Sequence, residues 1–540
     1  MSELASRPLG RRTFLRTALL GAGLVATPGL ISACSRPAGG PPQSAGPAGT
    51  LVFAVDALTG SSDPGIFTSF GNWMVIDCVA RGLTHIDYRS TEVQPALAES
   101  WTVSDDLLTY TFRIRQGVTF HDGNPVRAQD FERSWRRLFD EDDPTRAPST
   151  YASSELGGAN VASFRAVDDA TFEVKLVGPD VAFLARCSNP NSVALSSAAI
   201  EEKGQAIGDA LVGAGPYRFV SYQEGQSVTL ERFEEYWEGA PEVERVVFQI
   251  LPDPSALVSA LSNGSVNATN FAPVADVDRL GQTGLTLQSA EPYIDVFLGM
   301  NSGAPALSDL RVRQAINFAL DRDAVVSSAF AGKATTPAGL VTPAELGYAE
   351  SLKALSTRDV ARSRQLLAEA GAEGAQVEVL VQNTLFWPTI GQIVEQNLKE
   401  VGITPVMRYV DEATKSDVLN ASGHQLFLDQ RSAFVPDPDN KLTPLLASDS
   451  FVNESLTQHY RDAATQAELD RLLTEARGEP DEARRASLYE QVQRFFAEKI
   501  MVMSMLAYIY LPTVHAPAVS GLNADALGTY RAFFEEAKLG

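Results

Sequence analysis

The residue types that most often carry out catalysis are present in this sequence, but their spacing does not form a reaction centre. No two of the five histidines lie three or four positions apart, the spacing that brings two imidazoles to one zinc ion on a helix. The motifs G-x-S-x-G, S-x-x-K and G-x-x-x-x-G-K-[ST], which place nucleophiles or cradle phosphates, do not occur. Adjacent carboxylates fall in expected turns or at strand edges, where water solvates them: Asp105-Asp106, Asp168-Asp169 and Glu234-Glu235. We therefore expect no catalytic residue, no bound metal ion and no cofactor.

Cys34 is a residue whose surroundings predict a covalent modification. It ends the tetrapeptide Ile31-Ser32-Ala33-Cys34, which resembles a bacterial lipobox, the site where a thiol receives a lipid. Residues 1–33 then form the signal peptide, with a twin-arginine pattern in Arg11-Arg12-Thr13-Phe14-Leu15. The apolar run at 18–31 is too short to span a hydrocarbon core of about 30 Å. A chance cysteine beside the signal, and export by the general secretory route, remain the alternatives.

The segment after the signal peptide and the charge of the chain limit what the mature protein can bind. Residues 34–50 are rich in Pro, Gly, Ser and Ala without apolar periodicity, which predicts a flexible tether. The net charge of −23 repels nucleic acid and anionic lipid, so we expect contact with the membrane through the lipid anchor alone. The expected location is the outer face of the cytoplasmic membrane, or the periplasm.

Two further cysteines, Cys78 and Cys187, lie in apolar stretches of the body. A disulfide between them is possible in an oxidising compartment, but a body of this length has a hydrophobic core large enough to be stable without one. We expect both to be buried thiols.

Strand patterns dominate the first half of the body. Leu108, Tyr110, Phe112 and Ile114 alternate with polar residues, as half-buried strands do. Residues 213–232 predict two strands joined by a turn at Glu224-Gly225, and residues 246–250 predict a third.

Beyond residue 300 the apolar period changes to that of helices. Ser308 is expected to cap a helix whose apolar residues recur from Val312 to Leu320, and residues 358–370 form another that Gly371 ends. Alternating valines at 377–381, a helical pattern and a strand at 403–410 then predict a parallel βαβ unit. The sequence therefore predicts an α/β protein.

Four segments resemble one bacterial family, in the family's order. They are Pro95–Phe131 with Trp101 and His121-Asp122-Gly123, residues 213–237 (GAGPYRFVSYQEGQSVTLERFEEYW), residues 309–322 (DLRVRQAINFALDR), and Leu469–Tyr489. Together with the stretches between them they cover nearly all of residues 51–540. On these motifs the chain resembles the solute-binding proteins of bacterial ABC importers for oligopeptides and dipeptides, solute-binding protein family 5.

The resemblance implies a periplasmic-binding-protein-like fold with two main lobes around a hinged cleft and a third lobe inserted. Lobe I would be assembled from 51–86, 200–296 and 507–540, lobe II from 87–199 and lobe III from 297–506. It also implies a monomeric binding protein, not an enzyme, that captures a peptide or other small solute and delivers it to the transmembrane subunits of an ABC permease.

The resemblance places five residues in the cleft: Phe70, Trp387, Arg431, Phe434 and Tyr508. In peptide binders of the family, an aspartate ahead of an Asp-Pro pair binds the α-ammonium of the ligand. Aligning on Asp437-Pro438 puts Phe434 at that position and Arg431 where relatives often have Trp. A free peptide N-terminus is therefore not expected as the main recognition element, unless Asp429 or Asp437 substitutes.

Other functions remain open at this stage. Within the family the solute could be a peptide, an N-blocked peptide, an oligosaccharide or glycoside, an opine or a metal chelate. A secreted hydrolase would need a nucleophile and a base within hydrogen-bond reach. An adhesive or signalling lipoprotein would keep the fold and lose transport.

Overall fold

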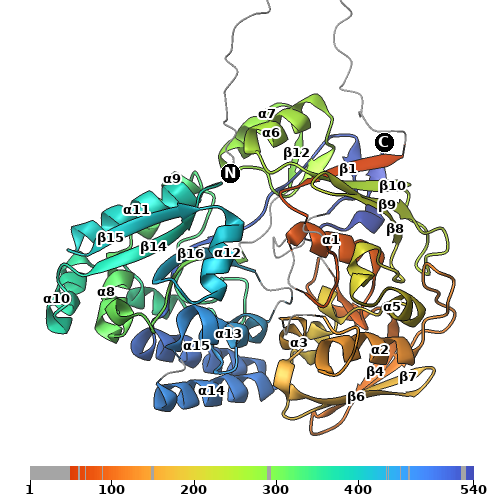
Figure 1. Ribbon diagram of the computed structural model, residues 1–540, viewed down its shortest axis with the longest axis horizontal. Helices are drawn as coiled ribbons and strands as arrows, with labels where there is room; N and C mark the ends of the chain where they lie inside the picture. The colour runs from red at the N-terminus through yellow and green to blue at the C-terminus, as the bar shows by residue number, and fades with distance from the viewer. Residues whose placement is uncertain are drawn as a thin grey trace, which may run out of the picture. The chain divides into compact units, whose positions relative to one another are not determined.

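The apolar patterns of the sequence resolve into an α/β fold built on three larger sheets (Figure 1). The computed structural model describes residues 49–58, 61–66, 69–87, 89–147, 151–288, 293–432, 435, 437–450, 452–459, 462–523 and 531–540. Each larger sheet carries its own cluster of buried apolar side chains. The predicted signal peptide with its arginine pair, Cys34 and nearly all of the tether lie outside the described residues, and so does Phe434.

The largest sheet has seven strands in the order β12-β18-β11-β1-β10-β9-β8. The strands β8 and β9 form the predicted hairpin, and Gly225 in its turn has a φ of 65°, which favours glycine. Helix α1 (Phe70–Val79) packs beside β8, and its first turn is capped by Ser69. The strands are β1 (Thr50–Val55), β8 (Tyr217–Gln223), β9 (Ser227–Arg232), β10 (Arg245–Ile250), β11 (Ala268–Thr269), β12 (Thr286–Gln288) and β18 (Thr513–His515).

An antiparallel sheet of four strands, in the order β4-β5-β7-β6, follows from the alternation seen in the sequence. In β5 the side chains of Tyr110, Phe112 and Ile114 are buried, as the alternation predicts. Helix α2 (Ala128–Phe139) covers β6 and β7 with Phe131 and Trp135. The strands are β4 (Ala98–Val103), β5 (Thr109–Ile114), β6 (Val161–Asp168) and β7 (Thr171–Leu176).

The third sheet has five strands in the order β15-β14-β16-β13-β17 and contains the predicted βαβ unit. Strands β14 and β15 are parallel, and α11 crosses between them (Figure 1). Strand β13 lies between β16 and β17 and is antiparallel to both. The strands are β13 (Ile294–Met300), β14 (Gln376–Gln382), β15 (Thr404–Val410), β16 (Leu426–Arg431) and β17 (Met503–Ile509).

Helices fill the region around this third sheet. Gly371, with a φ of 66°, ends α10 as predicted. The helices are α8 (Leu310–Ala319), α9 (Arg322–Ala329), α10 (Val360–Ala370), α11 (Trp387–Glu400), α12 (Glu412–Asn420), α13 (Pro438–Leu446), α14 (Ala463–Gly478) and α15 (Glu482–Lys499). The remaining elements are β2 (Thr84–Ile86), β3 (Val93–Pro95), α3 (Tyr151–Glu155), α4 (Phe183–Arg186), α5 (Ser197–Lys203), α6 (Pro254–Asn263), α7 (Val277–Gln282), β19 (Val519–Ser520) and β20 (Lys538–Leu539).

One local prediction is wrong in detail. Asp309, not Ser308, caps α8: its carboxylate accepts the N–H of Arg311, while Ser308 already has helical backbone angles and cannot serve as a cap. Gly213 and Gly215 allow the chain to pack closely on α1, because a Cβ at these positions would lie 2.2 and 2.5 Å from carbonyl oxygens of that helix.

Three further features of the described residues concern cysteines, metal ligands and helix length. Cys78 and Cys187 are buried free thiols, as expected. Among the described residues, no three His, Cys, Asp or Glu side chains gather as metal ligands would. The described helices include none with the length and apolar character that a membrane span requires.

Candidate functional site

The first turn of α13 is a point where side chains from distant parts of the chain meet. It carries the sequence Asp437-Pro438-Asp439-Asn440-Lys441, and proline at the first helical position suits its fixed backbone angle. The four polar residues of this turn each contact a different partner set. The partners are Arg485 for Asp437, Arg186 and Arg477 for Asp439, Glu155 for Asn440, and Asp295 and Glu345 for Lys441.

Lys441 contacts two carboxylates that are buried with it. Its Nζ lies 3.1 Å from Oδ2 of Asp295 and 2.6 Å from Oε2 of Glu345, with the Tyr293 ring centroid 4.6 Å away. The exposed fraction of each of these three charged side chains is at most 1%. The other oxygen of each carboxylate has no hydrogen-bond partner among the described residues. Two buried carboxylates therefore share one ammonium.

Burial makes Asp295 a group that titrates near neutral pH. Burial raises the pKa of Asp295 to about 7; the charge of Lys441 opposes the rise and that of Glu345 adds to it. Arg431, opposite Asp295 on the neighbouring strand, also lowers this pKa. The Lys441 pKa is raised, because its two carboxylates outweigh the effect of burial.

A second buried network ties the segment at 180–186 to α13 and α14. Arg186 forms ion pairs with Asp180, at 3.0 Å, and with Asp439. Arg477 reaches Asp439 from α14 at 3.2 Å, and its carbonyl accepts the backbone N–H of Val181. Burial alone would raise the pKa of Asp439, but the two arginines lower it. The pair of Arg186 and Asp439 joins residues 253 positions apart in the sequence.

Asp437 is fully engaged within the protein. Its two oxygens accept hydrogen bonds from Arg485 at 2.6 and 2.7 Å, and Oδ1 also caps α13 through the N–H of Asp439. Asp429 pairs with Lys415 at 3.0 Å. The suggestion that either residue binds a ligand ammonium would therefore require an existing ion pair to break.

The structure brings two of the predicted site residues, Arg431 and Tyr508, to either side of Asp295. In the sheet register Asp295 of β13 is opposite Arg431 of β16 and Tyr508 of β17. Tyr508 is fully buried, and its hydroxyl donates to the Gly339 carbonyl at 2.7 Å and accepts that residue's N–H at 3.2 Å. Arg431 is mostly buried and lies 3.7 Å from Glu155.

Phe70 and Trp387 lie in two separate apolar clusters. Phe70, at the start of α1, stacks on Phe271 with ring centroids 6.4 Å apart. Trp387 begins α11, is 2% exposed, and packs on Phe386 with Lys415 Nζ 5.6 Å from its ring. Their role as ligand contacts stays a prediction, as does that of Phe434, which lies outside the described residues.

Sequence reasoning did not single out Glu155, Asp295, Glu345 or Lys441. A signal was available for Asp295, because it is an isolated acid in the apolar run Tyr293-Ile294-Asp295-Val296-Phe297. A charge at the centre of an apolar strand requires a buried partner. The identity of that partner depends on tertiary contacts, which the sequence pattern does not reveal.

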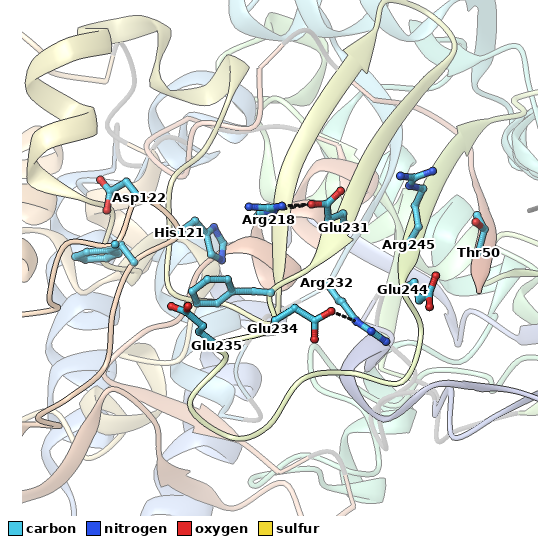
Figure 2. A pocket seen from close by; sticks show the side chains of 13 residues that line it. Thr50, His121, Asp122, Arg218, Glu231, Arg232, Glu234, Glu235, Glu244 and Arg245 are labelled. Atoms are coloured by element: carbon cyan, nitrogen blue, oxygen red, sulfur yellow. Dashed lines mark hydrogen bonds and ion pairs between the residues drawn. The ribbon is translucent and has the colours of Figure 1, made fainter. Parts of the chain in front are cut away.

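A surface cavity of about 700 Å³ lies elsewhere, beside β8 and β9 (Figure 2). Its charged groups largely pair with each other: Arg218 hydrogen-bonds Glu231, and Arg232 hydrogen-bonds Glu234 at 2.8 Å. Burial lowers the pKa of His121, in the same cavity, to about 4, so its ring is neutral at pH 7. Among the described residues, the predicted ligand contacts are not in its lining, so this cavity is separate from the α13 site.

Comparison with known proteins identifies the family. A model of the bacterial extracellular solute-binding proteins, family 5 (middle part), matches residues 92–453, well over half of the chain. The chain belongs to this family. The family prediction made from the sequence motifs is thereby confirmed.

This family 5 protein is similar to relatives that are named for different ligands. The glutathione-binding protein GsiB of Escherichia coli K12 is 28% identical over 422 residues, which cover 76% of this chain and 80% of GsiB. Heme-binding protein A of Haemophilus influenzae is 28% identical over 480 residues, covering 82% and 84%.

Solved structures confirm the fold class. DppA of Helicobacter pylori, in complex with the peptide STSA, aligns with a TM-score of 0.82 at 24% identity, covering 91% of this chain and 98% of DppA. AgaA of A. tumefaciens R10, in complex with agropinic acid, also gives 0.82, at 23% identity and coverage of 91% and 99%. At these identities the likeness shows the periplasmic-binding-protein fold alone.

Family membership settles the broad activity. The protein is a substrate-binding protein of an ABC importer and acts outside the cytoplasm. Members of the family bind solutes and are not enzymes, which confirms the expectation drawn from the family resemblance. The hydrolase alternative is therefore wrong.

Proposed function

We propose that this protein captures a peptide or peptide-like solute between closing lobes and passes it to an ABC importer. The lobes are those expected from the sequence: 51–86 with 200–296 and 507–540, the insertion 87–199, and 297–506. The three large apolar clusters support this division, because each draws mainly on one of these sets.

The observation that carries the proposal is the convergence on α13. Glu155 and Arg186 come from the inserted lobe and meet α13 of the third lobe, where Lys441 also pairs with Asp295 of the five-stranded sheet. Charged contacts between lobes are natural elements of a hinge that closes on a ligand and opens to release it. Buried ion pairs contribute little net stability but depend strongly on geometry, so they favour one relative position of the lobes.

The solute is proposed to be a peptide first and another small polar solute second. Peptide and glutathione appear in the names of similar proteins, as do heme and agropinic acid, so a non-peptide ligand is the second candidate. With Phe434 where peptide binders have an aspartate, the ligand would not depend on a free α-ammonium. A buried ammonium without a counter-ion would lose several kcal/mol.

The protein is also proposed to work as a monomer at the membrane surface, held by lipid on Cys34. Two or more acyl chains on this thiol would give stable attachment, since one chain alone binds weakly. The permease would then meet the loaded protein by diffusion at the membrane, not from solution.

Native mass spectrometry of protein purified from its own cells tests the ligand class. A closed protein should retain its solute, and the mass difference between native and denatured protein gives the ligand mass. A peptide mass that fragments into amino acids would support the first candidate. A sugar, opine or tetrapyrrole mass would replace it with the second.

A further inference from the structure

Arg431 has hydrogen-bonding capacity that the described part of the protein does not use. Its Nε is buried and has no hydrogen-bond partner among the described residues. Its Nη2 lies 3.7 Å from Oε1 of Glu155, whereas a charge-assisted hydrogen bond is about 2.7–2.9 Å long. A buried guanidinium with unmet donors favours an incoming group that can meet them.

Asn440 stands on the other side of the same carboxylate. Its Nδ2 donates to Oε2 of Glu155 over 3.3 Å, and its Oδ1 has no hydrogen-bond partner among the described residues. Asn440 is fully buried. The carboxylate of Glu155, 3% exposed, therefore sits between an arginine and an amide, and neither contact is short.

The carboxylate and its two donors come from different proposed lobes. Glu155 ends α3 in the inserted lobe, whereas Arg431 ends β16 and Asn440 lies in the first turn of α13 in the third lobe. A change in the relative position of these lobes would move Glu155 away from the donors without disturbing the donors themselves, because β16 and α13 belong to one apolar cluster.

We propose that Arg431 and Asn440 form a subsite for a carboxylate of the solute, and that Glu155 occupies this subsite until the solute displaces it. The subsite rests on the proposed capture function and narrows it to solutes that carry a carboxylate. A ligand carboxylate free to orient itself can bond Nε and Nη2 of Arg431 together, the fork geometry that arginine prefers. Glu155, tethered to α3, does not reach Nε.

The local pairing of Arg431 supports a carboxylate over a neutral group. Lys441 pairs with Asp295 and Glu345, whereas the ion-pair partner of Arg431 among the described residues is Glu155. A neutral group that displaced Glu155 would leave the guanidinium without this carboxylate contact. A carboxylate of the solute would replace the contact, and an amide would not.

Calorimetry with matched ligands tests the subsite. The probes are the peptide Ser-Thr-Ser-Ala and reduced glutathione, each with free carboxyl groups and as amides. Wild type should bind the acids at least about tenfold better than the amides, a difference of about 1.4 kcal/mol. Arg431→Met should remove this preference, and Glu155→Gln should improve acid binding about threefold or more because the competitor has lost its charge.

Matched controls separate the subsite from general charge effects. Arg113→Met and Glu99→Gln remove members of an exposed ion pair on β4 and β5 and should leave both affinities unchanged. If Arg431→Met proves unstable, Glu155→Gln/Arg431→Met removes both buried charges together and should still bind acid and amide alike. Equal binding of acid and amide by wild type would overturn the subsite.

A second measurement, which uses no peptide, applies if wild type binds none of these probes. That result would count against the peptide function but not against the subsite. Sodium propionate, compared with sodium chloride at equal ionic strength, should raise the melting temperature of Glu155→Gln and not that of the double variant. If propionate stabilises neither, or both equally, the subsite is refuted.

Discussion

Replacing Asp295 by Asn should flatten the dependence of thermal stability on pH. In the folded protein the pKa of Asp295 is about 7, against an ordinary value of 3.8, because the side chain is fully buried beside Glu345. The folded state therefore holds a proton that the unfolded chain releases. A raised pKa of this kind stabilises the folded state fully below about pH 4, and the effect is lost as the pH rises through 7.

The size of the effect follows from the shift. About three pKa units at 1.36 kcal/mol each give up to about 4 kcal/mol between pH 4 and pH 7. A folded unit of roughly 500 residues unfolds with an entropy of about 1 kcal/mol per kelvin. The melting temperature of wild type should thus fall by up to about 4 °C over this range, relative to Asp295→Asn.

Differential scanning calorimetry at pH 5, 6, 7 and 8 gives the comparison. Asp105→Asn, at an exposed position, is the matched control and should run parallel to wild type. Only the difference between variants is used, since other groups titrate in the same range. If the melting temperatures of wild type and Asp295→Asn change in parallel from pH 5 to pH 8, Asp295 does not hold the proton and the assignment of the buried charge is wrong.

Further substitutions test the buried network, the anchor and the cleft. Arg186→Met should lower the free energy of unfolding by about 3–5 kcal/mol, because Asp180 and Asp439 stay buried and lose their shared partner. Urea unfolding measures this free energy, and a loss below about 1 kcal/mol would contradict the network. Cys34→Ala should move the protein from the membrane to the soluble fraction on cell fractionation, and an unchanged distribution would exclude lipid attachment there. Phe434→Ala should weaken solute binding by roughly 1–3 kcal/mol through lost apolar contact, measured by calorimetry, and an unchanged affinity would place Phe434 outside the cleft.

Much of the local structure was predictable because it depends on neighbours in the sequence. Alternation in β5, the hairpin at Gly225, the Gly371 helix end and the βαβ unit at 376–410 all follow from patterns a few residues long. The wrong prediction at Ser308 also concerns neighbouring residues. Ser308 and Asp309 are both suitable helix caps by residue type, and only the backbone angles show that Asp309 is the cap.

The candidate site was predictable only in part. Arg431 and Tyr508 were both expected to line the cleft, and the sheet register places Asp295 between them. The partners of Lys441 were not foreseen, because Asp295 and Glu345 are respectively 146 and 96 residues away along the chain. No periodicity connects residues at such distances.

The sequence by itself determined the class of this protein: a chain with an export signal pattern, no reaction centre, an α/β body and the motifs of family 5. Only the tertiary structure decided which charges are buried and how they pair. The physical reason is that water solvates a charged side chain until folding buries it. A buried charge then needs a partner of opposite charge to avoid a large free-energy cost. Asp437, Asp439 and Lys441 have similar surroundings in the sequence, yet each is paired with a different distant segment.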